Sequence, residues 1–329
     1  MKWKLACLCL AAASGCGAQG VLLGTKGSYL FTAMDALALP GEEIDLRAQL
    51  RAGDFLQGRS GYAVRFYRDG QLYKVAETDA EGVAAVAFTP PAAGDVEFTA
   101  ALAPLGLEDE PPAPRQLLVA CRPAEAPMVV VDMDKTVVAT GFETVLVGDP
   151  EPMARSQEVL ADLAGDHTIV YLTHRPDYFS VKSKGWLRKH GYPRGPLLLS
   201  TLGGFLKGSG AFKRARIAEL KQRFTGIEIG IGDKVSDAQA YHDNGLRAFL
   251  IVQVPEGADA PTYEAMREDL APLADAVQVV TGWQQVADAL AGKGSYPPSA
   301  MQQRLGALAA EAEARAEKPG EAGPQGGGT

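Results

Sequence analysis

The hydrophobic pattern of this 329-residue chain changes at a proline-containing stretch, "CRPAEAP", residues 121–127. Before it, short runs of alternating apolar and polar residues, such as "EEIDLRAQL", are separated by turn residues. After it, nearly continuous apolar runs such as "HTIVYLT" alternate with amphipathic stretches such as "SQEVLADLAG". The first pattern is typical of a β-sandwich and the second of a parallel sheet buried on both faces. A hydrophobic content of 47% supplies enough apolar side chains for about two domains.

Residues 17–123 are predicted to form the β-sandwich. Asp69-Gly70 stands between two strand-like runs and is a strong signal for a β-hairpin. The segments "LPGEEIDLRAQL" and "TDAEGVAAVAFTPPAAGDVEFTA" resemble a bacterial immunoglobulin-like module and hold no catalytic constellation. We interpret this unit as a spacer, with an adhesive module as the alternative.

Residues 124–292 are predicted to form an α/β domain, in which a parallel sheet with right-handed crossovers carries helices on both faces. The stretch "DAVQVVTGWQQVADALAG" should add its last strand and a closing helix. Residues 293–329 are predicted to be a tail. The tail should consist of one solvated Ala/Glu-rich helix near Leu305–Ala316 and a disordered end rich in glycine and proline.

Residues 1–16 have the layout of an export signal, with Lys2 and Lys4, a short apolar run, and then small residues ending at Cys16. The run is too short to span a bilayer. "ASGC" resembles a bacterial lipobox, which implies that a lipid attached to Cys16 anchors an exported protein to the cell envelope. The alternative is a conventional cleaved signal on a periplasmic or secreted protein. Lipidation would leave Cys121 as a lone buried thiol.

Polar residues gather where the apolar runs of the predicted sheet end. The run "MVVVDMD" ends in two aspartates one residue apart, and "IEIGIGD" ends in a third. In an open parallel sheet, the carboxyl ends of the strands form one rim where ligands bind. That rim should carry Asp132, Asp134, Thr136, Thr173, Lys213, Asp233 and Asp237.

Carboxylates crowded at a buried strand end repel one another and lose hydration unless a cation compensates them. Hard oxygen ligands from two loops, completed by water, suit Mg²⁺. One carboxylate can then attack a phosphorus atom and form an aspartyl-phosphate. The other can protonate the leaving oxygen and later deprotonate water. The rim therefore predicts a magnesium site that carries out phosphoryl chemistry.

Four segments are similar, in order and spacing, to the motifs of the haloacid dehalogenase (HAD) superfamily of phosphotransferases, over residues 128–255. The segments are "VVVDMDKTVV", Thr173 after "IVYL", Lys213 and "GDKVSD". The resemblance implies a Rossmann-like parallel sheet and phosphatase activity. Lys135 departs from the pattern, because the family often has glycine or another small residue there.

Carried over residue by residue, the resemblance implies a role for each rim residue. Asp132 would be the nucleophile and Asp134 the general acid/base, with Thr136 steadying the loop. Thr173 would hydrogen-bond the phosphoryl group, and Lys213 would neutralise it. The implied Mg²⁺ ligands are Asp132, Asp233, Asp237 and the backbone carbonyl of Asp134.

"WLRKHGYPRGPLLLS" and the later "FKRARIAELKQRF" resemble the catalytic domain of lipins, which are phosphatidate phosphatases. They also resemble related domains of phosphatidylinositol-transfer proteins and fungal actin-patch phosphatases. This likeness implies a lipid phosphomonoester as substrate. The short flap between Thr136 and Thr173 leaves no room for a large cap, so the rim should be open.

Other charged residues near these motifs are given plainer interpretations. A basic cluster is interpreted as a solvated helix face, with contact to anionic headgroups as the alternative. It consists of Lys182, Lys184, Arg188, Lys189 and Lys207. His174, Arg175 and His190 are interpreted as surface or loop residues rather than catalytic ones.

Three functional hypotheses follow from these residues. The first is a membrane-tethered Mg²⁺-dependent phosphatase acting on phosphatidate or a related lipid phosphate. The second is a phosphatase of the same chemistry for small soluble phosphomonoesters, and the third is a surface binding protein with a vestigial phosphatase domain. A nucleic-acid partner is not expected, because a net charge of -8 provides no basic footprint.

Overall fold

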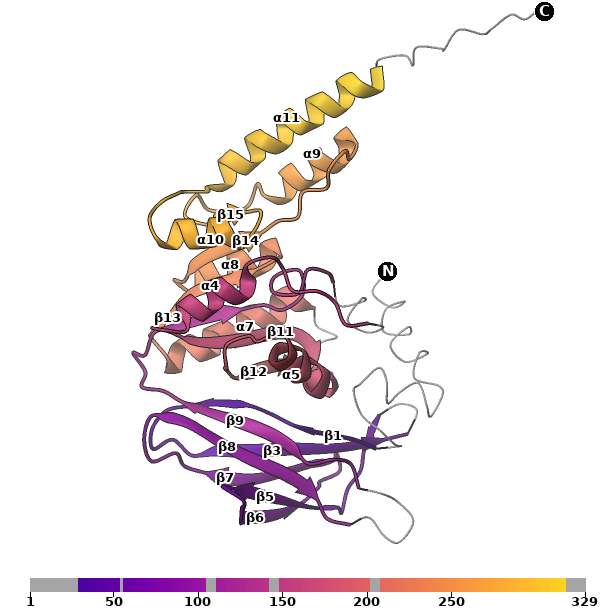
Figure 1. Ribbon diagram of the computed structural model, residues 1–329, viewed down its shortest axis with the longest axis vertical. Coiled ribbons are helices and arrows are strands. Elements are labelled where there is room, and N and C mark those ends of the chain that lie inside the picture. Colours follow the sequence, from indigo (N-terminus) through magenta and orange to yellow (C-terminus); the bar gives the residue numbers. More distant parts are fainter. Residues whose placement is uncertain (1–28, 54–55, 105–110, 142–147, 202–207, 318–329) are drawn as a thin grey trace, which may run out of the picture.

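The computed structural model of the protein describes residues 29–53, 56–104, 111–141, 148–201 and 208–317. An all-β unit precedes an α/β unit along the chain, and the two are stacked along the long axis of the molecule (Figure 1). The predicted fold class is therefore confirmed. The predicted signal and Cys16 lie outside the described residues.

The all-β unit consists of two sheets that face each other across a shared core. One sheet contains β1 (Tyr29–Ala33), β3 (Ile44–Ala52), β4 (Gln57–Gly58) and β7 (Val83–Phe88). The other contains β2 (Ala36–Ala38), β9 (Arg115–Cys121), β8 (Gly94–Leu102), β5 (Ala63–Arg68) and β6 (Gln71–Glu77), in that order. Alternate side chains from both sheets, including Phe31, Leu46, Phe66 and Phe98, form one buried cluster.

The hairpin predicted at Asp69-Gly70 joins β5 to β6. Both turn residues have positive φ angles, 50° at Asp69 and 75° at Gly70. This left-handed pair matches the twist of an antiparallel hairpin, and aspartate and glycine tolerate it better than most residues.

The α/β unit is built on six parallel strands in the order β12-β11-β10-β13-β14-β15. The strands are β10 (Met128–Val131), β11 (Thr168–Pro176), β12 (Leu197–Ser200), β13 (Ile227–Gly232), β14 (Arg247–Ile251) and β15 (Gln278–Val280). In register, Val131 lies opposite Tyr171 on one side and Ile231 on the other. The residues that follow these three strands therefore meet at one edge of the sheet.

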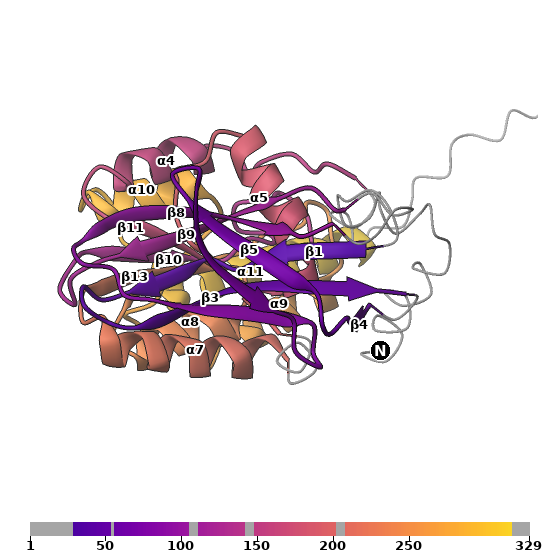
Figure 2. The same cartoon turned by 90° about the horizontal axis from the view of Figure 1, so that it is seen from below.

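Helices cover both faces of this sheet, as the view from below shows (Figure 2). One face packs against α4 (Ser156–Leu163), α5 (Ser180–Lys189) and α10 (Trp283–Leu290). The other packs against α7 (Ser209–Arg223), α8 (Val235–Asp243), α9 (Ala260–Asp269) and α11 (Pro298–Glu317). Because both faces are covered, the strands consist largely of buried apolar residues, as their sequences indicate.

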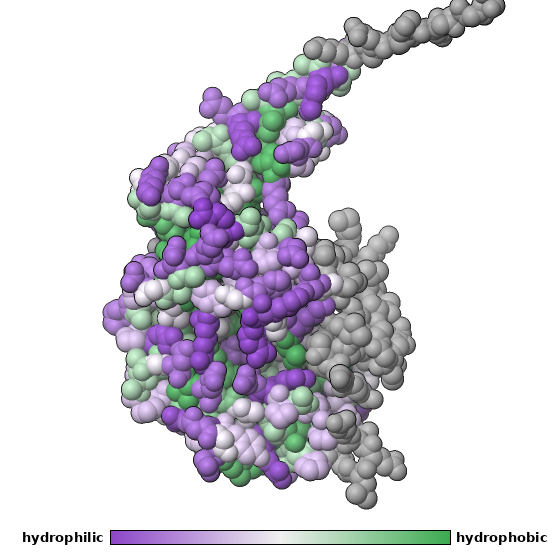
Figure 3. All heavy atoms as spheres, in the orientation of Figure 1, coloured by the Kyte–Doolittle hydropathy of each residue, from purple (hydrophilic) through white to green (hydrophobic). Residues whose placement is uncertain are grey.

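The expectation that the helix near Leu305–Ala316 is solvated is wrong. It belongs to α11, which packs along α9, and Met301, Leu305, Ala309 and Ala312 are buried. Figure 3 shows the apolar residues, in green, where α11 lies against α9 on an otherwise mostly hydrophilic face. The Ala-rich composition lets the two helices approach closely rather than leaving α11 in solvent.

Apolar contacts join the sandwich to the α/β unit. Leu37 and Ala120, from β2 and β9, belong to the same buried cluster as Leu220 and Phe224 at the end of α7. Arg223, between those two residues, donates to Glu42 at 2.6 Å and to the carbonyl of Leu37 at 3.0 Å. The sandwich therefore contributes to the core of the α/β unit on this side.

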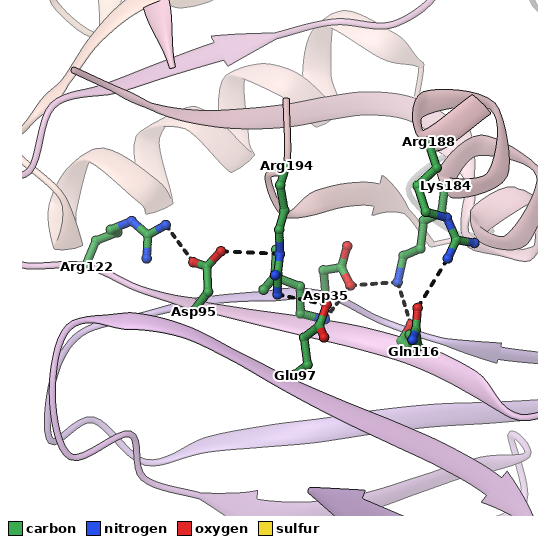
Figure 4. A network of polar contacts seen from close by, with 9 residues as sticks. Asp35, Asp95, Glu97, Gln116, Arg122, Lys184, Arg188 and Arg194 are labelled. Carbon is green, nitrogen blue, oxygen red and sulfur yellow. Dashed lines mark hydrogen bonds and ion pairs between the residues drawn. The ribbon is translucent and has the colours of Figure 1, made fainter. Parts of the chain in front are cut away.

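Charged pairs continue the interface on the opposite side of the sheet. The Lys184 ammonium on α5 lies 2.6 Å from Asp35 Oδ1, in the turn between β1 and β2. Figure 4 shows this pair and a second group, in which Asp95 lies between Arg122 and Arg194. Ion pairs thus lie across a wide part of the contact between the two units.

Cys121 is a buried free thiol, and burial raises its pKa. Within the described ranges, no helix is both long enough and apolar enough to cross a bilayer.

Candidate active site

The loop after β10 places the first two aspartates. The Asp132 amide continues the ladder with β13 by donating to Ile231 O at 2.9 Å, and the residue is only 3% exposed. The chain then turns sharply, because the amides of Val137 and Val138 both donate to the carbonyl of Met133. This turn places Asp132 and Asp134 at the carboxyl edge of the sheet, as the sequence predicts.

A buried lysine lies between two of the predicted carboxylates. The Lys213 ammonium, from α7, lies 2.8 Å from Asp132 Oδ2 and 2.5 Å from Asp237 Oδ2. Burial disfavours the charged form of Lys213, but the charges of Asp132 and Asp237 outweigh it, so its pKa lies well above the ordinary value. Burial likewise acts to raise the pKa of Asp132, and Lys213 reverses this and holds it below the ordinary value. Asp132 is therefore an anion at neutral pH, as a nucleophile requires.

Asp233 and Asp237 complete a three-carboxylate cluster with Asp132. One oxygen atom from each of the three lies within 4.8 Å of the other two. Burial and the charge of Asp132 raise the pKa of Asp233 to about 7. Burial also raises the pKa of Asp237, against the opposing effect of Lys213. When all three are ionised, they carry three negative charges around the one ammonium buried among them, with the exposed Lys234 as a further cation nearby.

Small residues in β13 allow α8 to approach this cluster. A Cβ atom on Gly230 would lie 2.3 Å from the ring of Tyr241, and one on Gly232 would lie 3.0 Å from the Cβ of Asp237. Glycine at these two positions therefore lets α8 pack against β13 and bring Asp237 to the strand end. The two glycines in "IEIGIGD" are therefore the sequence feature that allows this close packing.

The residues present fit a divalent cation. Asp233 Oδ1 and Asp237 Oδ1 are buried without a hydrogen-bond partner, which is costly for carboxylate oxygens unless a cation binds them. The donor set consists of hard carboxylate oxygens with excess negative charge, which Mg²⁺ prefers. Asp132, Asp233 and Asp237 are therefore the residues that could hold the metal.

Asp134 has a different partner, which sequence reasoning missed. Both of its carboxylate oxygens accept hydrogen bonds from Arg175, at 3.0 Å from Nε and 2.6 Å from Nη2. Arg175 is 2% exposed and also donates to Ser183 Oγ at 3.0 Å. The interpretation of Arg175 as a surface or loop residue is therefore wrong. Its position directly after a predicted strand end was the available signal.

The two predicted threonines are buried at the same edge. Thr173 follows the part of β11 that pairs with β10, and its Oγ1 accepts from the Arg175 amide at 3.3 Å. Thr136 is fully buried, and its carbonyl accepts from the Trp283 indole at 2.7 Å. The hydrogen bond from Trp283 thus holds the turn after β10 at Thr136. Thr173 lies on β11, the strand beside β10, which Asp132 follows.

Lys135 has a φ angle of 55°, in the left-handed region that favours glycine. This geometry gives a physical reason for the small residue that the HAD pattern often has at this place. The lysine adopts a backbone conformation that costs more for a side chain with a Cβ atom.

The basic cluster is largely engaged within the protein. Lys184 binds Asp35, Lys189 pairs with Asp149, and Arg188 donates to the side chain of Gln116. Lys207 lies outside the described residues. Because Lys184 and Arg188 contact the sandwich, the members of the cluster that the structure describes do not together form a free cationic face.

The stretch "GYPRGPLLLS" has a structural role. Tyr192 donates to the carbonyl of Val137 at 2.9 Å and lies 2.6 Å from Ser156 Oγ. A Cβ atom on Gly195 would lie 1.9 Å from the carbonyl oxygen of Ile169. These residues support the turn after β10 and let the chain cross β11 before it enters β12.

Comparison with known proteins matches one continuous stretch of the α/β unit to a single domain family. The LNS2 domain model of PITM 1-3 matches residues 129–254, which contain every predicted site residue. Among curated proteins, none matches the sequence well enough to count as a relative.

Several solved structures resemble parts of the chain, with low identity. A class C acid phosphatase from Bacillus anthracis with tungstate bound shares 16% identity, covers 55% of this chain and 78% of its own, and has a TM-score of 0.31. A chain of the Pnkp1/Rnl/Hen1 RNA repair complex shares 16% identity over 44% of this chain and 50% of its own, with a TM-score of 0.35. A CARDB domain from Pyrococcus furiosus shares 15% identity over 29% of this chain and 95% of its own, with a TM-score of 0.21.

Proposed function

We propose that the chain is a Mg²⁺-dependent phosphatase that acts through an aspartyl-phosphate on Asp132, with phosphatidate or a related lipid phosphate as its favoured substrate. The observation that carries this proposal is the buried cluster of Asp132, Asp233 and Asp237 around Lys213. The LNS2 match over residues 129–254 supports the phosphatase class.

The nucleophile is the carboxylate of Asp132. Lys213 favours its ionised form, and its ammonium, 2.8 Å from Asp132 Oδ2, would also neutralise charge on the phosphoryl oxygens. A bound Mg²⁺ would supply electrophilic stabilisation of those oxygens. Thr173, buried on the neighbouring strand, would donate its hydroxyl to the same group.

Asp134 is the candidate for proton transfer. It lies two residues from the nucleophile, and its side chain is 18% exposed, so it borders both the rim and solvent. It would give a proton to the leaving oxygen and then take one from the water that hydrolyses the aspartyl-phosphate. Arg175 fixes the orientation of the carboxylate through both of its oxygens.

The lipid preference is supported by the likeness of "WLRKHGYPRGPLLLS" to lipin-type domains, and by the predicted lipid on Cys16. The basic cluster gives it no support, since Lys184 and Arg188 contact the sandwich. A second candidate, hydrolysis of small soluble phosphomonoesters, uses the same residues.

The test is phosphate release by the full chain in detergent micelles, with Mg²⁺ or EDTA, from phosphatidate and from a panel of soluble phosphomonoesters. We expect Mg²⁺-dependent release with preference for phosphatidate, and its loss in Asp132→Asn. Preference for soluble esters would keep the chemistry and replace the substrate. Full activity of Asp132→Asn would overturn the mechanism, and inactivity of the native chain on every ester would favour a binding protein.

A further inference from the structure

We propose that the β-sandwich positions Asp134 for proton transfer, through an ion pair between Arg51 of the sandwich and Asp177, two residues after Arg175. This inference rests on the proposed function for its catalytic meaning. The physical link itself is a set of contacts that can be tested separately. It replaces the interpretation of the sandwich as a spacer with that of a structural part of the active site.

The link begins at the bidentate contact between Arg175 and Asp134. A planar guanidinium that binds both oxygens of a carboxylate fixes its direction as well as its distance. The third contact of Arg175, to Ser183 on α5, ties the guanidinium to that helix. The orientation of Asp134 therefore depends on where β11 ends and where α5 lies.

The segment between β11 and α5 is held by the sandwich. It is a short 3₁₀ helix, η1 (Asp177–Phe179), which follows Pro176. Arg51, on β3, lies 2.8 Å from Asp177 Oδ1 and donates to Oδ2 at 3.0 Å. Both residues are 8% exposed, so the pair is nearly enclosed and little screened by solvent.

Apolar contacts surround this ion pair. Leu30 of β1 and Phe179 of η1 form a small buried cluster with Leu56 and Tyr178 packed against it. The Arg51 guanidinium also lies 5.9 Å from the centre of the Tyr178 ring. The sandwich thus contacts η1 through apolar side chains as well as through the ion pair.

A second anchor holds α5 itself. The Lys184 ammonium, next to Ser183 in the sequence, contacts Asp35 at 2.6 Å and donates to the carbonyls of Ala33 and Gln116. Every one of these acceptors belongs to the sandwich. The two residues that flank the Arg175 contacts, Asp177 and Lys184, are therefore both bound by the other unit.

The position of this contact sets it apart from the rest of the interface. The Arg223–Glu42 pair also joins the two units and is partly buried, but Arg223 ends α7 just before β13 starts. That is the amino edge of the sheet, opposite the rim. Arg223 therefore offers a matched control, with the same residue type and interface but no link to Asp134.

The experiment compares Arg51→Met and Arg223→Met in the full chain with Mg²⁺, on an alkyl phosphomonoester and on p-nitrophenyl phosphate. An alkoxide is a poor leaving group and needs the proton from Asp134, whereas p-nitrophenolate leaves readily without it. General acid catalysis contributes about 10²–10⁴-fold, so partial loss of positioning should lower kcat/KM on the alkyl ester by roughly 10–100-fold. We expect kcat/KM on p-nitrophenyl phosphate, which reports only the steps up to formation of the aspartyl-phosphate, to fall less than about threefold.

This larger loss on the alkyl ester than on the aryl ester should be absent in Arg223→Met. It should be smaller in Arg51→Lys, which keeps the charge. Equal losses of kcat/KM on both esters in Arg51→Met, or the same alkyl-specific loss of kcat/KM in Arg223→Met, would overturn the proposal. If Arg51→Met does not fold, Arg51→Lys and Asp177→Glu displace the pair while keeping both charges. An alkyl-to-aryl ratio unchanged from the native chain in both would also overturn it.

Hydrogen exchange separates this proposal from the proposed function. In the metal-free chain, Arg51→Met should speed amide exchange in residues 133–138 and 174–183, and Arg223→Met should not. Unchanged exchange in these segments would exclude the link even in an active enzyme. Faster exchange in a chain that hydrolyses no ester would keep the link and reject the phosphatase.

Discussion

Asp132 and Asp134 stand two residues apart in one turn, yet their surroundings differ. Asp132 is buried and paired with Lys213 of α7, among carboxylates that carry excess negative charge. Asp134 is partly exposed and paired with Arg175, whose segment is held by the sandwich. The proposed nucleophile, Asp132, therefore belongs to a cluster built within the α/β unit, while the proposed general acid/base, Asp134, depends on both units.

This difference separates the chemistry of the two halves. The contacts around Asp132 act on charge at the phosphoryl group, which every ester shares. Those around Asp134 act on the leaving oxygen in the first step, where the demand for a proton varies with the ester, and on the attacking water in the second, which every ester shares. In the first step, the two halves can be distinguished by whether a substitution affects all esters or only those with poor leaving groups.

The largest effect is expected for Lys213→Met. Removing the ammonium leaves Asp132 and Asp237 buried without their cationic partner and removes neutralisation of the phosphoryl charge. Loss of such a stabilising group costs about 10²–10³-fold in kcat, and we expect the upper end on alkyl and aryl esters alike. Steady-state kinetics on both ester types checks this.

The control for that variant is Lys234→Met, which removes an exposed cation from the same rim. Its activity should stay within about tenfold of the native chain, since an exposed charge is screened by solvent. A similar loss of kcat in both variants would mean that the overall electrostatic potential at the rim, and not the contacts of Lys213, determines activity.

Asp134→Asn should show a smaller and selective effect. The amide cannot carry the proton to the leaving oxygen, so kcat on an alkyl phosphomonoester should fall about 100-fold or more. On p-nitrophenyl phosphate, formation of the aspartyl-phosphate should slow only a little. The rate of the initial burst of p-nitrophenol, measured by rapid quench, would show this. An equal loss of burst rate on both esters would place Asp134 in the charge cluster instead.

The contrast between the two aspartates also shows what the sequence could predict. The apolar runs that end in Asp132 and Asp233, and the glycines of "IEIGIGD", locate the carboxylate cluster, because parallel strands bring their ends to one edge. The Arg175 contact was missed, since the pattern after "HTIVYLT" does not show where the side chain points. It depends on the turn after β10 and on α5, which are tertiary features.

The sandwich contacts were missed for the same reason. Arg51 alternates with apolar residues in a strand-like run, so the pattern predicts that its side chain faces outward from the sandwich. Its partner Asp177 lies 126 residues away, in a different unit. Likewise, the Ala/Glu-rich sequence of α11 predicts a solvated helix, because nothing in it indicates that α9 packs against it. The units follow from periodicity, but the contacts between them do not.

Metal and pH should affect the stability of the Asp132 half through its carboxylate cluster. Because burial raises the pKa of Asp233 to about 7, the folded metal-free chain holds a proton between about pH 4 and 7 that the unfolded chain has lost. The contribution of Asp233 to stability is therefore present below about pH 4 and disappears as the pH rises through 7. Mg²⁺ should reverse this loss, by about 2.7 kcal/mol at 100 times its Kd.

Thermal unfolding from pH 5 to 8, with Mg²⁺ or EDTA, measures this effect. The gain in Tm from Mg²⁺ should increase with pH, and Asp233→Asn should remove most of both the pH slope and the gain. A Mg²⁺ effect that is the same at pH 5 and pH 8 would show that proton release from the cluster is not linked to metal binding.

The smallest effect is expected for Lys135→Gly, in the turn that joins the two halves. Lys135 has a left-handed backbone, and glycine would relieve about 1 kcal/mol of strain, less the extra freedom it gives the unfolded chain. We therefore expect a small rise in stability with kcat within about twofold on both ester types. Lys135→Ala removes the ammonium but keeps the strain, so it should give no such rise. If both variants instead lost more than about tenfold in kcat, the charge of Lys135 would contribute to catalysis, and the backbone conformation of the turn would not be its main role.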